Sequence, residues 1–164
     1  LYVARINPVK GINEFLEMFN NLEMEAELSI IGKTNNLRHQ KKFKSLIENS
    51  KNIKFHGYVS SRQELINTYD NHNILILPSY TEGQPYVVDE SLVRRRPVLI
   101  FEDIAQIIRG RRGIFVAKRN VTSFIETTKF IMTNYLKIQK DIEQNNFPLE
   151  KDMFQEISNV VKNN

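Results

Sequence analysis

The sequence contains no cysteine, so disulfide bonds, thiolate zinc sites and cysteine nucleophiles are excluded. It also lacks long apolar runs. The longest ones, residues 74–77 and 98–101, are far shorter than the roughly 20 residues that a helix needs to cross a membrane. We therefore expect no membrane-spanning helix.

Several motifs that mark common reaction centres are absent. The sequence has neither GxGxxG, the dinucleotide fingerprint, nor GxxxxGK[ST], the phosphate-binding loop. HExxH and GxSxG are missing as well. The three histidines, His39, His56 and His72, lie on separate predicted elements and lack the spacing of metal ligands. We therefore expect no bound metal and no resident cofactor.

The length of 164 residues suits one domain, or one domain with a tail. Hydrophobic residues make up 41% and charged residues 26%, which is typical of a globular protein and not of a disordered or fibrous one. The chain begins with Leu1-Tyr2-Val3, inside a predicted strand, so we interpret it as part of a longer protein. We predict one domain over residues 1–135, followed by C-terminal helices over 136–164 that pack on it or on a missing N-terminal domain.

Apolar strands and amphipathic helices alternate about six times along the chain. The predicted strands cover residues 1–6, 27–31, 53–58, 73–78, 97–101 and 113–116. The predicted helices cover residues 11–22, 37–47, 61–71, 86–95, 103–109, 121–135, 136–144 and 149–161, with Ser60 or Ser61 and Asp103 as N-caps. Strands without a polar face are typical of a parallel sheet that is covered on both sides. The pattern predicts an α/β fold with a doubly wound, six-stranded parallel sheet, that is, a Rossmann-like domain.

Charged residues follow two of the predicted strands, where doubly wound sheets bind their ligands. Arg5 and Lys10 share a strand-to-helix loop and together form a clamp suited to a diphosphate. Glu82 lies on the loop after the fourth strand and Glu90 on the next helix, about 8 Å beyond its start, so the two carboxylates can hold two ends of one ligand. Pro85 suits the first turn of this helix, whose free N–H groups favour a phosphate. Taken alone, each of these charges is better explained as surface charge.

Taken in order, these segments are similar to those of one enzyme family. Segment 3–11, VARINPVKG, is similar to a Gly-Arg-…-Lys-Gly signature, and segment 74–90, from ILILPSYTEG through VVDE, to a Glu-x7-Glu region. The strands at 28–32, 53–59, 97–99 and 113–116 fall in the same register. Over residues 1–131 the chain resembles the C-terminal, donor-binding domain of retaining GT-B glycosyltransferases, often called glycosyltransferase group 1.

This resemblance implies transfer of a sugar, with retention of configuration, from a UDP-, GDP- or ADP-sugar to a glycan, lipid or small-molecule acceptor. It implies that Arg5, Lys10 and Glu82 are catalytic: the two cations neutralise the leaving diphosphate, and Glu82 contacts the donor sugar. It also implies that Glu90 accepts both ribose hydroxyls. The other implied donor-binding residues are Gly57, Tyr58 and Val59 around the base, and Gly83, Gln84, Pro85, Tyr86 and Val87 near the diphosphate. The acid–base residue and the acceptor pocket belong to the missing N-terminal domain.

The sequence departs from the family pattern in three places. Arg94-Arg95-Arg96 stands where a small residue and glycine are usual, and a left-handed residue costs more without glycine, so we expect this helix end to be built differently. Glu102-Asp103-Ile104-Ala105 replaces the usual Gly-Gly loop, and Gln84-Pro85-Tyr86 replaces an aromatic residue followed by glycine or proline. These departures bear on the sugar and the acceptor more than on the class of activity.

Three alternatives stay open at this point. They are a nucleotide-sugar 2-epimerase, a non-catalytic glycosyltransferase-like partner protein, and a binding module that uses the basic segment 94–119. The chain has a net charge of +4, and that segment alone holds eight basic and two acidic residues. It suits an anionic membrane surface, whereas no recognised motif supports nucleic-acid binding. We expect a cytoplasmic protein, either free or peripheral on the inner membrane face.

Overall fold

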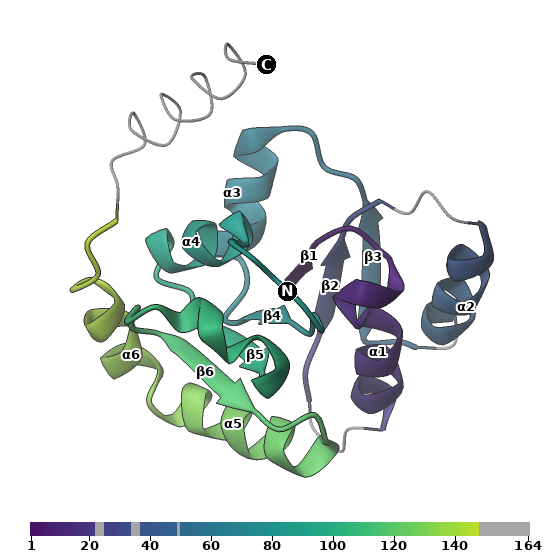
Figure 1. Cartoon of the computed structure of the whole chain (residues 1–164). Coiled ribbons are helices and arrows are strands. Elements are labelled where there is room, and N and C mark those ends of the chain that lie inside the picture. The colour runs from purple at the N-terminus through teal and green to yellow at the C-terminus, as the bar shows by residue number, and fades with distance from the viewer. Residues whose placement is uncertain (22–24, 34–36, 49, 148–164) are drawn as a thin grey trace.

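The computed structural model describes residues 1–21, 25–33, 37–48 and 50–147. Six short strands run through this part of the chain and pair in parallel throughout. They are β1 (Tyr2–Val3), β2 (Leu28–Ile31), β3 (Ile53–Gly57), β4 (Leu75–Leu77), β5 (Val98–Phe101) and β6 (Ile114–Ala117). They form two three-stranded sheets, ordered β1-β2-β3 and β4-β5-β6 (Figure 1). The predicted α/β fold with parallel strands is confirmed.

Leu1 joins the two sheets. Its nitrogen donates to the Ile74 carbonyl at 2.9 Å, and its own carbonyl accepts from the Ile76 amide at 2.8 Å. β1 therefore lies beside β4, and the six strands follow the order β3-β2-β1-β4-β5-β6. This is the doubly wound, Rossmann-like order, in which the connection reverses between β1 and β4.

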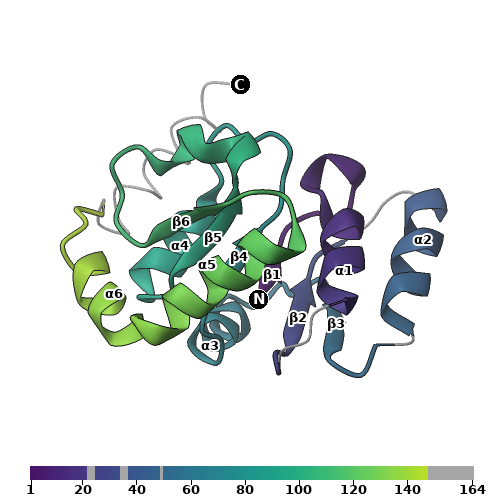
Figure 2. The same ribbon diagram turned by 90° about the horizontal axis from the view of Figure 1, so that it is seen from below.

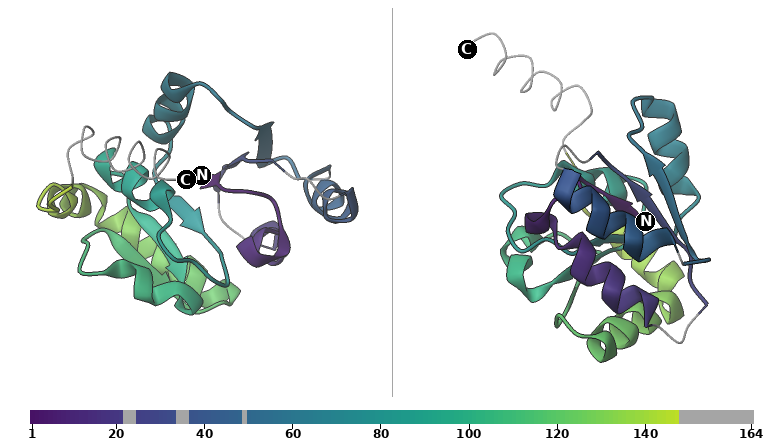
Figure 3. Two further views of the ribbon diagram at one scale, coloured as in Figure 1. Left: turned by 45° about the horizontal axis from the view of Figure 1, so that its top comes forward. Right: turned by 90° about the vertical axis from the view of Figure 1, so that its right-hand side faces the viewer.

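Helices cover both faces of the sheets. They are η1 (Pro8–Lys10), α1 (Ile12–Asn20), α2 (Leu37–Glu48), α3 (Arg62–Asp70), α4 (Tyr86–Val93), η2 (Glu102–Ile108), α5 (Val121–Thr133) and α6 (Tyr135–Ile142). α1 and α5 lie side by side on one face (Figure 2), where the rings of Phe15 and Phe124 meet edge-to-face with centroids 5.4 Å apart. α3 and α4 lie on the opposite face (Figure 3). The predicted helix at 149–161 lies outside the described residues.

The ends of two predicted elements differ from expectation. β1 ends at Val3, not at residue 6, because the chain bends at Ala4, although the Ala4 and Ile6 amides still donate to the Ile31 and Lys33 carbonyls at 3.1 and 2.9 Å. The short helix η1 then begins at Pro8, with Asn7 as its N-cap. Asp103 caps no helix. The N-cap of η2 is Phe101, and the Asp103 carboxylate pairs with Arg119 instead. Ser61 is confirmed as the N-cap of α3, accepting from the Glu64 amide at 3.3 Å.

The expectation of a different helix end after α4 is wrong. Arg95 adopts the left-handed conformation with φ of 55°, although it is not glycine. This backbone costs an L-residue roughly 1–2 kcal/mol. Arg95 also makes two contacts with the C-terminal part of the domain: its guanidinium bonds the Glu143 carboxylate at 2.6 Å, and its carbonyl accepts from Gln139 at 3.2 Å.

Gly11 lies where the loop after β1 touches the loop after β4. Its φ is +61°, and a Cβ there would stand 2.1 Å from the Pro78 carbonyl oxygen. Gly110 has a similar φ of +74° but open space around it. We expect Gly11→Ala to lower the free energy of unfolding by about 2–5 kcal/mol, since left-handed strain and overpacking add. Gly110→Ala should cost only about 1–2 kcal/mol. Urea denaturation measures both, and equal losses would contradict the close approach.

Candidate functional site

A cleft of about 770 Å³ opens at the carboxyl ends of β1, β2 and β3, beside the start of α3 and the second turn of α4. Ligands of doubly wound folds bind at this edge. Five of the residues predicted for the site line the cleft: Arg5, Tyr58, Val59, Val87 and Glu90. The other seven do not line it: Lys10, Gly57, Glu82, Gly83, Gln84, Pro85 and Tyr86.

Glu90 lines the cleft from the second turn of α4, as predicted from its spacing. The Tyr69 hydroxyl donates to its Oε2 at 2.8 Å. Tyr69 belongs to α3 and is 2% exposed. Burial, followed by the negative charge of Glu90, raises the pKa of Tyr69, so its phenol stays protonated and remains a donor. Nothing in the local sequence pattern singles out this tyrosine, because the contact joins two elements that only the fold brings together.

Lys10 and Glu82 form a second cluster outside the cleft lining. The Lys10 ammonium lies 2.5 Å from Glu82 Oε1, and the Ser79 hydroxyl donates to the same oxygen at 2.6 Å. The Glu82 side chain is only 8% exposed and Ser79 is fully buried. The predicted clamp is therefore divided in this structure, because Arg5 lines the cleft while Lys10 bonds Glu82.

Tyr2 bonds the backbone of Arg5. Its hydroxyl donates to the Arg5 carbonyl at 3.0 Å and its ring is fully buried in the core. Burial, with a smaller contribution from the charge of Glu82, raises the pKa of Tyr2. The backbone that carries Arg5 is thus fixed to the core, while the Arg5 side chain has no carboxylate partner among the described residues.

Arg119 holds the segment that leads to Glu82. Its guanidinium donates to the Pro78 carbonyl at 2.9 Å, to the Ser79 carbonyl at 3.1 Å and to Asp103 Oδ2 at 2.6 Å. It also stacks over the rings of Tyr80 and Phe101, 4.1 and 4.6 Å from their centroids. Asp103 belongs to the segment that replaces the Gly-Gly loop of the family. Ser79 and Arg119 were not predicted, although the spacing of Ser79 and Glu82 fits a side-chain contact across one turn.

The start of α4 is accessible to an anion. Pro85 is its N-cap and supplies no side-chain hydrogen bond to the first turn. The preceding Gly83 carbonyl accepts from Arg109 at 3.4 Å. An uncapped helix N-terminus presents N–H groups that favour a negatively charged ligand. This agrees with the phosphate role predicted for residues 83–87, which stays a prediction.

The basic segment 94–119 is largely neutralised within the domain. Five of its eight basic side chains form ion pairs: Arg94 and Arg96 with Asp70, Arg95 with Glu143, Arg111 with Asp89, and Arg119 with Asp103. Of the helices in the described residues, none is long and apolar enough to cross a membrane. In the same part of the chain no cluster of three His, Asp or Glu residues could hold a metal ion. Binding to a membrane surface stays a prediction.

The family follows from the sequence match. Residues 1–134 match the family model described as glycosyl transferases group 1. The chain belongs to this family. The resemblance inferred from the segments around Arg5, Lys10, Glu82 and Glu90 is therefore confirmed at the level of the family, whereas the retaining mechanism and the roles of these residues stay predictions.

Solved glycosyltransferases share the fold of this group 1 chain. A glycosyltransferase from Rickettsia africae superposes with a TM-score of 0.74 at 17% identity, over 99% of this chain and 48% of that chain. Anabaena Alr3699/HepE, solved in complex with UDP and glucose, gives 0.69 at 12% identity, over 86% and 40%. The C-terminal domain of the group 1 protein LpcC from Francisella tularensis gives 0.66 at 20% identity, over 88% and 79%.

The chain spans about half the length of the first two of these proteins. That share fits one of the two halves of a GT-B fold. No curated protein sequence matches the chain.

In this group 1 chain, Arg119 should be a main determinant of local stability around Glu82. A lysine supplies one compact ammonium and cannot serve two carbonyls, a carboxylate and two rings at once. We expect Arg119→Lys to lower the free energy of unfolding by about 2–3 kcal/mol, since buried acceptors lose their donors. The control is Lys118→Ala at the exposed neighbouring side chain, which should change stability by less than about 0.5 kcal/mol. Equal effects in urea denaturation would show that the Arg119 contacts contribute nothing.

Proposed function

We propose that this chain is the donor-binding half of a retaining glycosyltransferase that uses a nucleotide sugar. One observation carries the proposal: in a member of the group 1 family, the cleft at the carboxyl ends of the strands is lined by both a guanidinium, Arg5, and a carboxylate, Glu90. A cation suits a diphosphate and an anion suits sugar hydroxyls. The neighbour from Anabaena, which was solved with UDP and glucose, supports the same class of ligand.

In this proposal the nucleoside lies in the cleft. Glu90 accepts hydrogen bonds from the two ribose hydroxyls, and the main chain of Gly57, Tyr58 and Val59 frames the base. The diphosphate lies between Arg5 and the uncapped start of α4, near Tyr86 and Val87. Fixed positive charge at this place stabilises the leaving diphosphate as the bond to the sugar breaks.

Lys10 and Glu82 act at the sugar end of the donor. The Lys10 ammonium adds to the charge that stabilises the leaving group, and Glu82 binds hydroxyls of the transferred sugar. Ser79 and Lys10 both bond Glu82 Oε1, so this carboxylate is held in one orientation. A fixed carboxylate selects a sugar by the position of its hydroxyls, since a misplaced hydroxyl leaves a buried acceptor unpaired. The acceptor and the acid–base group are supplied by the other half of the GT-B fold.

The proposal is tested by a thermal-shift panel of UDP, GDP, ADP and their sugar conjugates against the 164-residue chain. We expect one base to raise the melting temperature. Half a cleft leaves the donor exposed, so the Kd should be about 0.1–1 mM, or roughly 4–5.5 kcal/mol. Transfer without the other half is not expected. If none of these nucleotides stabilises the chain at concentrations of several millimolar, the donor-binding role is wrong.

Substitution of the two glutamates should weaken the binding of different ligands. Glu90→Gln should weaken nucleoside diphosphate and nucleotide sugar alike, because charge-assisted hydrogen bonds worth roughly 1.5–3 kcal/mol each become neutral ones. Glu82→Gln should weaken only the nucleotide sugar, because the diphosphate lies on the other side of the start of α4. ¹⁵N NMR titration measures millimolar Kd values for both variants. A loss of diphosphate affinity in Glu82→Gln alone would mean that the donor lies in the opposite direction.

A further inference from the structure

The carboxylate of Glu90 is held from behind by a buried phenol. Tyr69 lies on α3, one helix away from Glu90, and its hydroxyl donates to Glu90 Oε2 at 2.8 Å. The Tyr69 ring is 2% exposed, so the core fixes its position. Glu90 itself is only partly buried and lines the cleft. The acidic side chain at the cleft is therefore hydrogen-bonded to a buried group outside the cleft lining.

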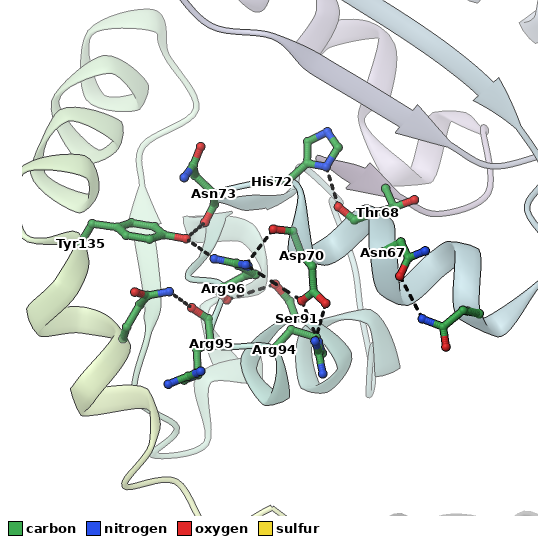
Figure 4. A network of polar contacts seen from close by, with 12 residues as sticks. Asn67, Thr68, Asp70, His72, Asn73, Ser91, Arg94, Arg95, Arg96 and Tyr135 are labelled. Carbon is green, nitrogen blue, oxygen red and sulfur yellow. Dashed lines mark hydrogen bonds and ion pairs between the residues drawn. The ribbon is translucent and has the colours of Figure 1, made fainter.

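The helix that carries Tyr69 is itself fastened to α4. Asp70, the next residue, accepts from the Arg94 side-chain Nε at 2.8 Å. The Asp70 carbonyl accepts from the Arg96 guanidinium at 2.7 Å, and Tyr135 of α6 bonds both Arg96 and the Asn73 carbonyl (Figure 4). The direct contacts of Asp70 with Arg94 and Arg96 fix the C-terminal end of α3 against the C-terminal end of α4, with Glu90 one turn before Arg94. The distance between Tyr69 and Glu90 is thus set by the helices and not by the two side chains alone.

The chemistry of the contact makes it directional. A protonated phenol bound to a carboxylate can only donate, so it takes up one oxygen of Glu90 and leaves the other, Oε1, without this contact. An ionised carboxylate accepts hydrogen bonds and does not donate them. Two hydroxyls on adjacent carbons of a ligand are matched donors for such a group. Because the orientation exists before binding, less conformational entropy is lost when the ligand arrives.

We propose that Tyr69 is a positioning residue that presents the Glu90 carboxylate to the vicinal diol of a ligand bound in the cleft. This inference rests on the proposed function, since it needs a ribose at Glu90. It adds to ligand recognition a residue from outside the cleft lining.

The test uses one variant of the chain and two ligands. Tyr69→Phe removes the hydroxyl and keeps the ring. The ligands are UDP, or whichever of UDP, GDP and ADP binds most tightly in the panel above, and its 2′,3′-dideoxy analogue, which lacks the diol. By ¹⁵N NMR titration we expect Tyr69→Phe to weaken the ribonucleotide about fivefold, as for loss of one hydrogen bond. The dideoxy analogue should bind wild type and variant equally within about twofold.

Tyr135→Phe is the matched control. It removes another tyrosine hydroxyl from the same network, one that bonds Arg96 and a backbone carbonyl and has no contact with Glu90. It should leave both Kd values unchanged within about twofold, and its melting temperature shows what losing such a hydroxyl does to stability alone.

Three results would overturn the proposal. Equal weakening of both ligands in Tyr69→Phe, or a variant that no longer folds, would assign Tyr69 a purely structural role. An unchanged Kd for the ribonucleotide would remove it from ligand binding while the proposed function stands. A wild-type chain that binds no ribonucleotide would defeat the proposed function and this inference together, and that outcome is visible before any variant is made.

Discussion

Two hydrogen bonds at Leu1 join the sheet that carries Arg5 to the sheet that precedes Glu82 and Glu90. They place β1 beside β4, and the chain direction then brings the loops after these two strands to the same edge. Arg5 and Lys10 come from the first loop, whereas Glu82 and the start of α4 come from the second. The absence of a side chain at Gly11 allows the loops to touch, since the Pro78 carbonyl occupies the space of its Cβ. Lys10 and Glu82 can therefore form an ion pair because β1 of one sheet lies beside β4 of the other.

Much of the positive charge in this chain serves the fold. Arg94, Arg95 and Arg96 end α4 and connect it to α3 and to α6, while Arg119 supports the segment before Glu82. Ion pairs at exposed positions contribute little to stability. Their main effect here is geometric: Arg94, Arg95 and Arg96 fix the C-terminal end of α4, which carries Glu90. The sequence excess of cations in segment 94–119 therefore overstates the charge that is available for binding an anionic surface.

The fold could be predicted from the sequence because its signals are local. Apolar runs such as 74–77 are buried on both sides, and helical spacing is visible without knowledge of neighbours. The candidate carboxylates could also be found, because their spacing along one chain segment carries the signal. Tyr69 and Arg119 could not be found in this way, since each acts through contacts between elements distant in sequence. Ser79 lies only three residues before Glu82, so its contact carried a local signal that was not recognised. Asp103 illustrates a local signal that was misleading. Its residue type suits an N-cap, but its carboxylate forms an ion pair with Arg119, which is distant in sequence.

The two glutamates differ in how their charge is compensated, and this difference gives them different chemistry. Glu82 is paired with a cation, so the Lys10–Glu82 cluster as a unit is close to neutral and repels a phosphate only weakly. Glu90 is held by a neutral phenol, which places no positive charge beside its carboxylate. An uncompensated carboxylate repels a diphosphate, so Glu90 favours ligands whose hydroxyls reach it while their phosphates lie elsewhere. Arg5, which has no carboxylate partner among the described residues, supplies the opposite charge at the same cleft. In the proposed function, the opposite charges of Glu90 and Arg5 favour one orientation of a ligand that carries a diol at one end and a diphosphate at the other.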